Sequence, residues 1–157
     1  MIHMHVPELP PSINNAYMHV RIFNKKGGGG GGGVKQVLTD AGRKFKKEAT
    51  AHLSKKYPLA LATLKENKPY TILLRFTVSA LENKGWVNGT TDRYKRNDAT
   101  NRIKILEDVL VDVSGVDDKH FMLVACQKVQ GQVEGTDIYI WSTEEEGSPF
   151  DAIALNF

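Results

Sequence analysis

A chain of 157 residues, 41% of them hydrophobic, has the length of a single domain and enough apolar side chains for a buried core. It contains no apolar run of the ~18 residues that a membrane span needs, and its first residues lack the pattern of a secretory signal. The single cysteine excludes an internal disulfide, the cysteine and histidine spacing gives no zinc site, and the net charge of +3 is modest.

Short elements are predicted in the first forty residues. Residues 2–7 predict a strand, and the two prolines that follow predict a fixed loop over residues 9–17. Residues 18–23 predict a short extended segment. The glycine run that follows predicts a flexible loop over residues 24–36. It does not end in the Gly-Lys-Ser/Thr of a phosphate-binding loop, so no nucleotide cofactor is expected.

A long helix and the clearest strand come next. Thr39 or Asp40 can cap a helix over residues 40–55, and its apolar residues recur at helical spacing: Ala41, Phe45, Ala49 and Leu53. The Tyr-Pro pair after it ends the helix. Residues 70–80 are rich in β-branched and aromatic side chains and predict a strand. A polar loop is expected over residues 82–95.

The remaining elements complete a small α/β (α+β) domain. Residues 98–113 predict a second helix, and residues 119–130 and 136–142 predict two strands that a turn over residues 131–135 joins as a hairpin. The order β-α-β-α-β-β indicates two helices on a mixed sheet of about four strands, with edges free for dimerisation. This domain is expected over residues 1–143, followed by an acidic tail over residues 144–157.

Polar residues of the second predicted helix recur on one arc, and apolar residues recur on the adjoining one. The polar arc holds Asn101, Lys104, Asp108 and Asp112; the apolar arc holds Ile103, Leu106, Val109, Leu110 and Val113. Asp98 precedes the helix, and Asp117 and Asp118 follow it. Carboxylates beside an amide and an ammonium suit metal-dependent phosphodiester chemistry. The alternative is an N-cap, a solvated helix face and an ordinary turn.

Basic residues gather in two parts of the chain. The candidates for binding DNA phosphates are Lys44, Lys47, Arg93, Lys95, Arg96 and Arg102. A basic surface beside a carboxylate cluster suits a polyanionic substrate, although solvated helices show the same composition.

Four landmarks in chain order resemble the RusA-type Holliday junction resolvases, which are phage and prophage endodeoxyribonucleases. They are Pro-Pro-Ser-Ile-Asn-Asn-Ala-Tyr at residues 10–17, Leu-Thr-Asp-Ala-Gly-Arg-Lys-Phe at residues 38–45, the pattern Asp-x-x-Asn-x-x-Lys-x-x-x-Asp from Asp98 to Asp108, and Gly-Val-Asp-Asp at residues 115–118. Together they extend over about residues 10–121.

The resemblance implies a homodimeric crossover junction endonuclease of DNA recombination and repair. It implies hydrolysis of branched DNA with Mg²⁺ (or Mn²⁺ as a substitute), in the cytoplasm of a bacterial host. By motif position, the catalytic residues are Asp98, Asn101, Lys104, Asp108 and Asp118. The metal ligands are Asp98, Asp117 and Asp118.

One position departs from the family pattern. Thr100 stands where many relatives carry a second essential aspartate. Asp117, Asp108 or a water held by Thr100 can compensate; otherwise activity is reduced or lost. Two alternatives to the active nuclease therefore remain: a DNA-binding relative with weakened or no activity, and a small protein-interaction domain.

Overall fold

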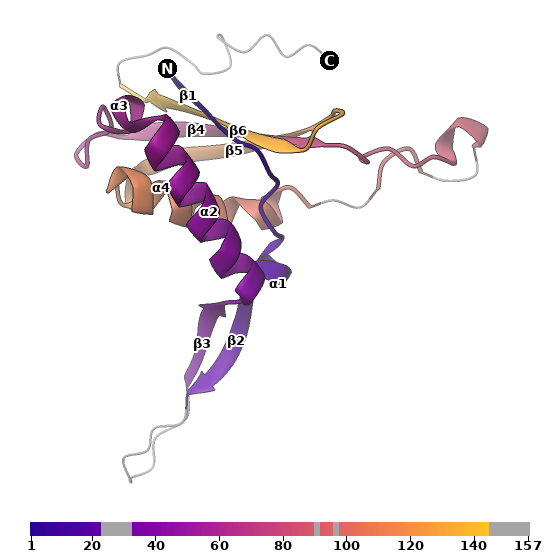
Figure 1. Ribbon diagram of the computed structural model, residues 1–157, viewed down its shortest axis with the longest axis horizontal. Coiled ribbons are helices and arrows are strands. Elements are labelled where there is room, and N and C mark those ends of the chain that lie inside the picture. The colour runs from indigo at the N-terminus through magenta and orange to yellow at the C-terminus, as the bar shows by residue number, and fades with distance from the viewer. Residues whose placement is uncertain (23–32, 90–91, 96–97, 145–157) are drawn as a thin grey trace.

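A four-stranded mixed sheet with helices on one face forms the body of the computed structural model, which describes residues 1–22, 33–89, 92–95 and 98–144 (Figure 1). The strands lie in the order β1-β6-β4-β5: β1 (Ile2–Val6), β6 (Gly135–Ser142), β4 (Tyr70–Val78) and β5 (Phe121–Gln130). β4 pairs parallel with β5 and antiparallel with β6, which in turn pairs antiparallel with β1.

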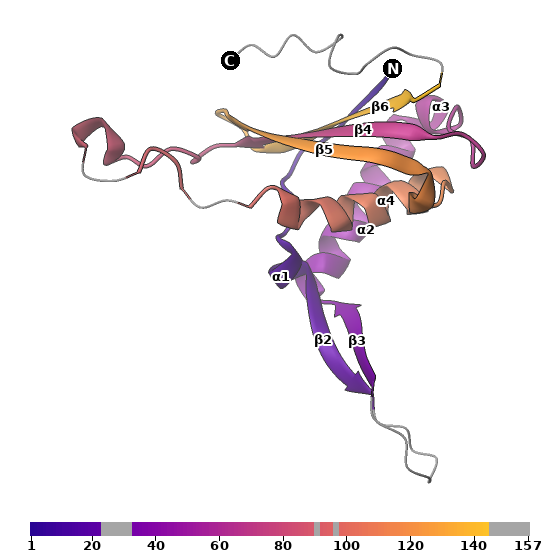
Figure 2. The same cartoon turned by 180° about the vertical axis from the view of Figure 1, so that it is seen from behind.

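Two long helices, α2 (Asp40–Lys56) and α4 (Ile103–Ser114), pack on each other and on this sheet (Figure 2). Both are amphipathic, and the core takes their apolar faces together with the buried side chains of β4 and β6. From α2 it receives Phe45, Ala49 and Leu53, and from α4 it receives Ile105, Leu106, Val109 and Leu110. The predicted fold class is confirmed: a small single domain with a mixed four-stranded sheet.

A second, two-stranded sheet projects from the body. It consists of β2 (Tyr17–Ile22) and β3 (Gly33–Leu38), which pair antiparallel (Figure 2). The segment predicted over residues 18–23 is therefore a strand. The predicted loop over residues 24–36 extended too far, because residues 33–36 pair in β3; residues 24–32 lie outside the described part of the chain.

Shorter helical turns connect these elements. They are α1 (Ile13–Ala16), α3 (Pro58–Leu61) and the 3-10 turns η1 (Trp86–Asn88), η2 (Thr100–Arg102) and η3 (Asp118–His120). α1 lies inside the segment predicted as a loop over residues 9–17. In the described part of the chain, no helix has both the length and the apolarity to cross a membrane.

Two predictions about the long helices need correction. The helix expected from residue 98 begins at Ile103, after the separate turn η2, and Arg102 is drawn aside to donate a hydrogen bond to the carbonyl of Pro10. On α2, Ala41 is exposed while the neighbouring Gly42 is buried. The first turn of α2 therefore packs against α1 through Gly42 and not through Ala41.

The predicted hairpin between the last two strands is wrong, because β4 lies between β5 and β6. The connection passes over the end of β4, where the backbone N–H of Gly131 donates to the carbonyl of Val78 at 3.1 Å. A Cβ at Gly131 would lie 2.3 Å from Cγ2 of Thr77, so the close passage requires glycine. β4 lies inside the sheet and most of its side chains are buried: Ile72, Leu74 and Phe76 on one face join the core, while the other face carries Thr71, Arg75 and Thr77.

Gly42 is the tightest contact between α2 and α1, and Gly42→Ala is expected to destabilise the protein. A Cβ there would lie 2.3 Å from the carbonyl oxygen of Ala16, which already accepts from the N–H of Thr39 at 2.8 Å. We expect a loss of about 1–3 kcal/mol in the free energy of unfolding, despite the better helix propensity of alanine. Urea unfolding measures it. Gly33→Ala, where a Cβ meets nothing within 4 Å, is the control, and equal stability of the two variants would contradict the expectation.

Candidate active site

Lys104, on the first turn of α4, links two carboxylates of the predicted motif. Its Nζ lies 2.9 Å from Oδ1 of Asp108, one helical turn further along, and 3.5 Å from Oδ2 of Asp118. Asp118 comes back to this face because Gly115, the residue after α4, has a φ of 72° and turns the chain. Its hydrogen bond with Asp108 raises the pKa of Lys104, so the ammonium is charged at neutral pH.

Tyr17 connects the first residue of β2 to the same carboxylate. Its hydroxyl donates to Oδ2 of Asp108, 91 positions away in sequence. Burial raises the pKa of Tyr17, and the hydrogen bond to Asp108 raises it further, so the phenol remains a donor. Asp108 is thereby held through both oxygens, one by Lys104 and one by Tyr17.

Four aspartates line one open cleft of about 210 Å³ between α2, α4 and the segment after α4. Its lining residues are Lys46, Asp108, Val111, Asp112, Asp117 and Asp118. Lys46 of α2 pairs with Asp112 at 3.0 Å. Oδ1 of Asp117 accepts from the backbone N–H of Lys119 at 3.0 Å, and this bond is the main cause that lowers the pKa of Asp117.

Glu107 adds a further carboxyl group to this electrostatic environment. Burial raises its pKa; Lys104 opposes that shift, and the charges of Asp118 and Asp108 add to it. The crowding of acidic groups here is thus balanced by two lysines, Lys46 and Lys104.

The carboxylate oxygens of the acidic cleft are the type of ligand that Mg²⁺ prefers. Within the described ranges, no three His, Cys, Asp or Glu side chains converge closely enough to hold a metal ion by themselves. Mg²⁺ does not require such a cage, since it is commonly held by one or two carboxylates together with waters and substrate phosphates. Asp117 and Asp118 line the same open cleft and can supply these one or two carboxylates.

The first residues of the motif stand apart from this cleft. Asp98 is exposed and accepts a hydrogen bond of 3.2 Å from Nδ2 of Asn101, and neither residue lines the cleft. Both precede α4, whereas Asp117 and Asp118 follow it. Thr100 is exposed and begins η2. The structure therefore brings together Lys104, Asp108, Asp117 and Asp118, without Asp98 or Asn101.

The predicted DNA-binding residues fall into separate places. Lys47 lines a groove of about 380 Å³ on α2 that shares Lys46 and Asp112 with the acidic cleft. Lys44 faces a different cavity, Arg93 pairs with Glu82 at 2.9 Å, and Lys95 is exposed. Arg96 lies outside the described residues.

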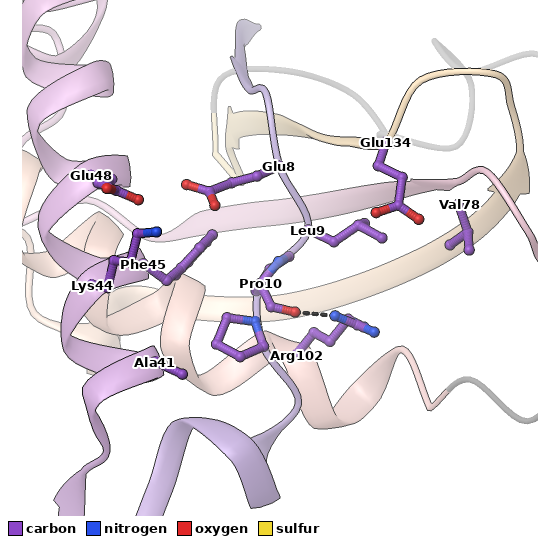
Figure 3. A pocket seen from close by; sticks show the side chains of 11 residues that line it. Glu8, Leu9, Pro10, Ala41, Lys44, Phe45, Glu48, Val78, Arg102 and Glu134 are labelled. Atoms are coloured by element: carbon purple, nitrogen blue, oxygen red, sulfur yellow. Dashed lines mark hydrogen bonds between the residues drawn. The ribbon is translucent and has the colours of Figure 1, made fainter.

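Arg102 is half-buried in a cavity of about 400 Å³, where its guanidinium donates to the carbonyl of Pro10 (Figure 3). Burial lowers the pKa of Arg102, which nevertheless stays charged at neutral pH. Glu8 and Glu48 lie across the same cavity near Lys44 (Figure 3). This cavity shares no lining residue with the acidic cleft, and the contact of Arg102 with Pro10 holds the proline loop against α4.

Sequence reasoning missed three residues of the cleft's surroundings: Tyr17, Lys46 and Glu107. Tyr17 ends the proline-containing landmark, which was a signal for a role near the site. Lys46 belongs to a run of basic residues on α2 in which nothing distinguishes it. Only the packing of α2 against α4 brings Lys46 to Asp112.

Comparison with protein families places most of the chain in a known family model. Residues 14–141 match the family model described as Endodeoxyribonuclease RusA. This range contains β2, both long helices and every residue of the acidic cleft. No curated protein matches the chain.

Proposed function

Because this chain belongs to the RusA endodeoxyribonuclease family, we propose that it resolves Holliday junctions or related branched DNA by Mg²⁺-dependent phosphodiester hydrolysis. The observation that carries the proposal is the cleft in which four aspartates meet Lys46, with Lys104 bonded to two of those carboxylates. A mixed acidic and basic site of this kind suits a metal ion and a phosphate together. Action on phage or prophage DNA in a bacterial host is part of the proposal.

We assign the metal to Asp118 and Asp117, with Asp98 as a further ligand by its motif position. A bound Mg²⁺ would stabilise the charge that develops on the phosphate and lower the pKa of the attacking water. Lys104 would neutralise phosphate charge in the transition state. Asp108 positions Lys104, since their atoms lie 2.9 Å apart, and Tyr17 in turn orients Asp108. Asn101, through its bond to Asp98, would orient that carboxylate.

The groove beside the cleft supplies the phosphate contacts of the proposal. Arg43, Lys46 and Lys47 line it on α2. Such contacts neutralise backbone charge without reading bases, so binding is expected to be salt-sensitive and independent of sequence. Lys95 is exposed outside this groove and is a separate candidate for a phosphate contact.

We propose a homodimer, because a four-way junction must be cut on two strands and a two-fold axis supplies two equivalent sites. A dimer is expected at micromolar concentration in sedimentation velocity without DNA. A monomer alone under these conditions would contradict it.

The direct test is cleavage of a synthetic four-way junction. We expect paired nicks with Mg²⁺ or Mn²⁺, none with EDTA, and much slower cutting of a linear duplex of the same sequence. Thr100 favours a second candidate, a relative that binds junctions but cuts them weakly or not at all. Tight binding without cleavage at any Mg²⁺ concentration would support that candidate. Absence of DNA binding would instead favour a protein-interaction domain.

Thr100→Asp is expected to lower the Mg²⁺ concentration required for half-maximal cleavage by several-fold, with a smaller effect at saturating Mg²⁺. The new carboxylate would stand two residues after Asp98 and just before α4, where a negative charge is also favourable by about 0.3–1 kcal/mol. Thr100→Asn, which adds similar bulk without charge, is the control. An unchanged Mg²⁺ midpoint would show that position 100 does not face the metal.

A further inference from the structure

We propose that residues 81–89 and 92–95, here called the arm, form a platform on which unpaired bases of branched DNA stack. The inference rests on the proposed function, whose cleft and groove it does not use. The arm projects from one end of the sheet, away from both long helices (Figure 1). It therefore extends the surface on which a large branched substrate can lie.

The base of the arm is held by specific hydrogen bonds. The N–H of Asn83 donates to the carbonyl of Arg93 at 2.8 Å, and that of Lys95 donates to the carbonyl of Leu81 at 2.9 Å. Oε1 of Gln130, the last residue of β5, accepts from the N–H groups of Leu81 and Glu82 at 2.9 and 3.2 Å. The arm thus has a defined two-stranded base that is joined to the sheet.

Two aromatic side chains of the arm are exposed. Trp86 is 37% exposed and Tyr94 is 52% exposed, whereas Trp141, the other tryptophan of the chain, is 3% exposed in β6. The guanidinium carbon of Arg93 lies 4.8 Å from the ring centroid of Trp86 and 5.0 Å from that of Tyr94. Arg93 therefore organises both rings into one cluster.

Glu82 completes the cluster, since its Oε1 pairs with Nη2 of Arg93 at 2.9 Å and accepts from Nε at 3.0 Å. The contact with Glu82 occupies the guanidinium of Arg93 within the arm. The exposed surfaces of the two rings are therefore the main area of the arm that a ligand can contact. Lys84 and Lys95 are exposed on the same arm and supply positive charge for the phosphates. Pre-ordered rings with lysines beside them suit a base and its backbone, because every base presents a π-face and every nucleotide a negative charge.

Unpaired bases are the occupant that this chemistry favours. A stacked duplex covers its base faces, whereas the open centre of a branched molecule exposes them. An apolar protein surface would not use the exposed lysines. The arm is thus assigned to DNA at or near the branch point.

Tryptophan emission tests the proposal with the full-length protein and without divalent metal, so that cleavage plays no part. The probe is a four-way junction with unpaired thymines at its centre, compared with a linear duplex of equal length. We expect the junction to quench wild-type emission and to leave Trp86→Phe nearly unchanged, because the remaining Trp141 is buried. Trp86→Ala should weaken junction binding by about 5- to 150-fold and duplex binding much less, and Trp86→Phe should retain most of the affinity.

Leu59→Ala is the matched control, since Leu59 is 84% exposed on α3 and lies outside the arm. Its junction affinity should equal that of the wild type, and circular dichroism should show that Trp86→Ala remains folded. Equal junction affinity of Trp86→Ala and wild type, without quenching, would overturn the platform while leaving the endonuclease proposal intact. A wild type that never cuts, but whose junction binding still depends on Trp86, would instead remove the endonuclease activity alone.

Discussion

Asp118→Asn is expected to reduce junction cleavage by at least about 10³-fold while junction binding stays equal or becomes tighter. Asp118 lines the acidic cleft and lies 3.5 Å from Nζ of Lys104. Its replacement removes a charged oxygen ligand and so weakens the metal, but it also removes repulsion between the site and the phosphates. Cleavage rates under single-turnover conditions and binding without metal separate these two effects.

Asp40→Asn is the control for loss of charge alone. Asp40 begins α2, pairs with Arg43 at 2.5 Å and does not line the cleft. Its cleavage rate should stay within a few-fold of the wild type. Asp98→Asn is expected to match Asp118→Asn if both hold the metal. Full cleavage by either variant would remove that aspartate from the site.

Lys104→Met is expected to lower the maximal cleavage rate by about 10²–10³-fold, the usual effect of removing one charged group that stabilises a transition state. The ammonium lies between Asp108 and Asp118, so its loss leaves those carboxylates more negative. Less Mg²⁺ should therefore be needed for half-maximal cleavage even as the maximal rate falls. A Mg²⁺ titration of cleavage measures both quantities.

Lys104→Arg separates charge from position. It keeps a cation beside both carboxylates, so the Mg²⁺ midpoint should stay near that of the wild type, while the altered geometry lowers the rate less than Lys104→Met. If Lys104→Met retained full activity, Lys104 would act only to balance charge within the cleft.

Much of the fold was predictable because it depends on local patterns. The apolar spacing of Phe45, Ala49 and Leu53 predicted α2, and the same reasoning placed Leu106, Val109 and Leu110 in the core. The side-chain hydroxyl of Thr39 caps α2, as its position suggested, by accepting from the N–H of Gly42 at 3.1 Å. Periodicity and capping involve residues within a few positions of one another, so they are visible in a single sequence.

The order of strands was not predictable in the same way. The four residues between β5 and β6 are the length of an ordinary hairpin connection, and strands adjacent in sequence usually pair. β4 nevertheless takes an inner position, where β5 and β6 flank it on both edges and most of its side chains are buried. The order of the strands therefore depends on how much side-chain surface the whole sheet buries, which a single segment of sequence does not reveal.

The contacts of the candidate site likewise separate into those that local sequence spacing predicts and those that depend on tertiary packing. The sequence by itself determined the spacing of Lys104 and Asp108, which one helical turn converts into a salt bridge. The sequence also contains Gly115, which allows the chain to turn back after α4 toward Asp118. Only the tertiary structure decided that Tyr17 reaches Asp108, that Lys46 of α2 reaches Asp112, and that Asp98 stays outside the cleft. These contacts join residues from separate elements, and their distances follow from how the helices pack on each other and on the sheet, which no local pattern encodes.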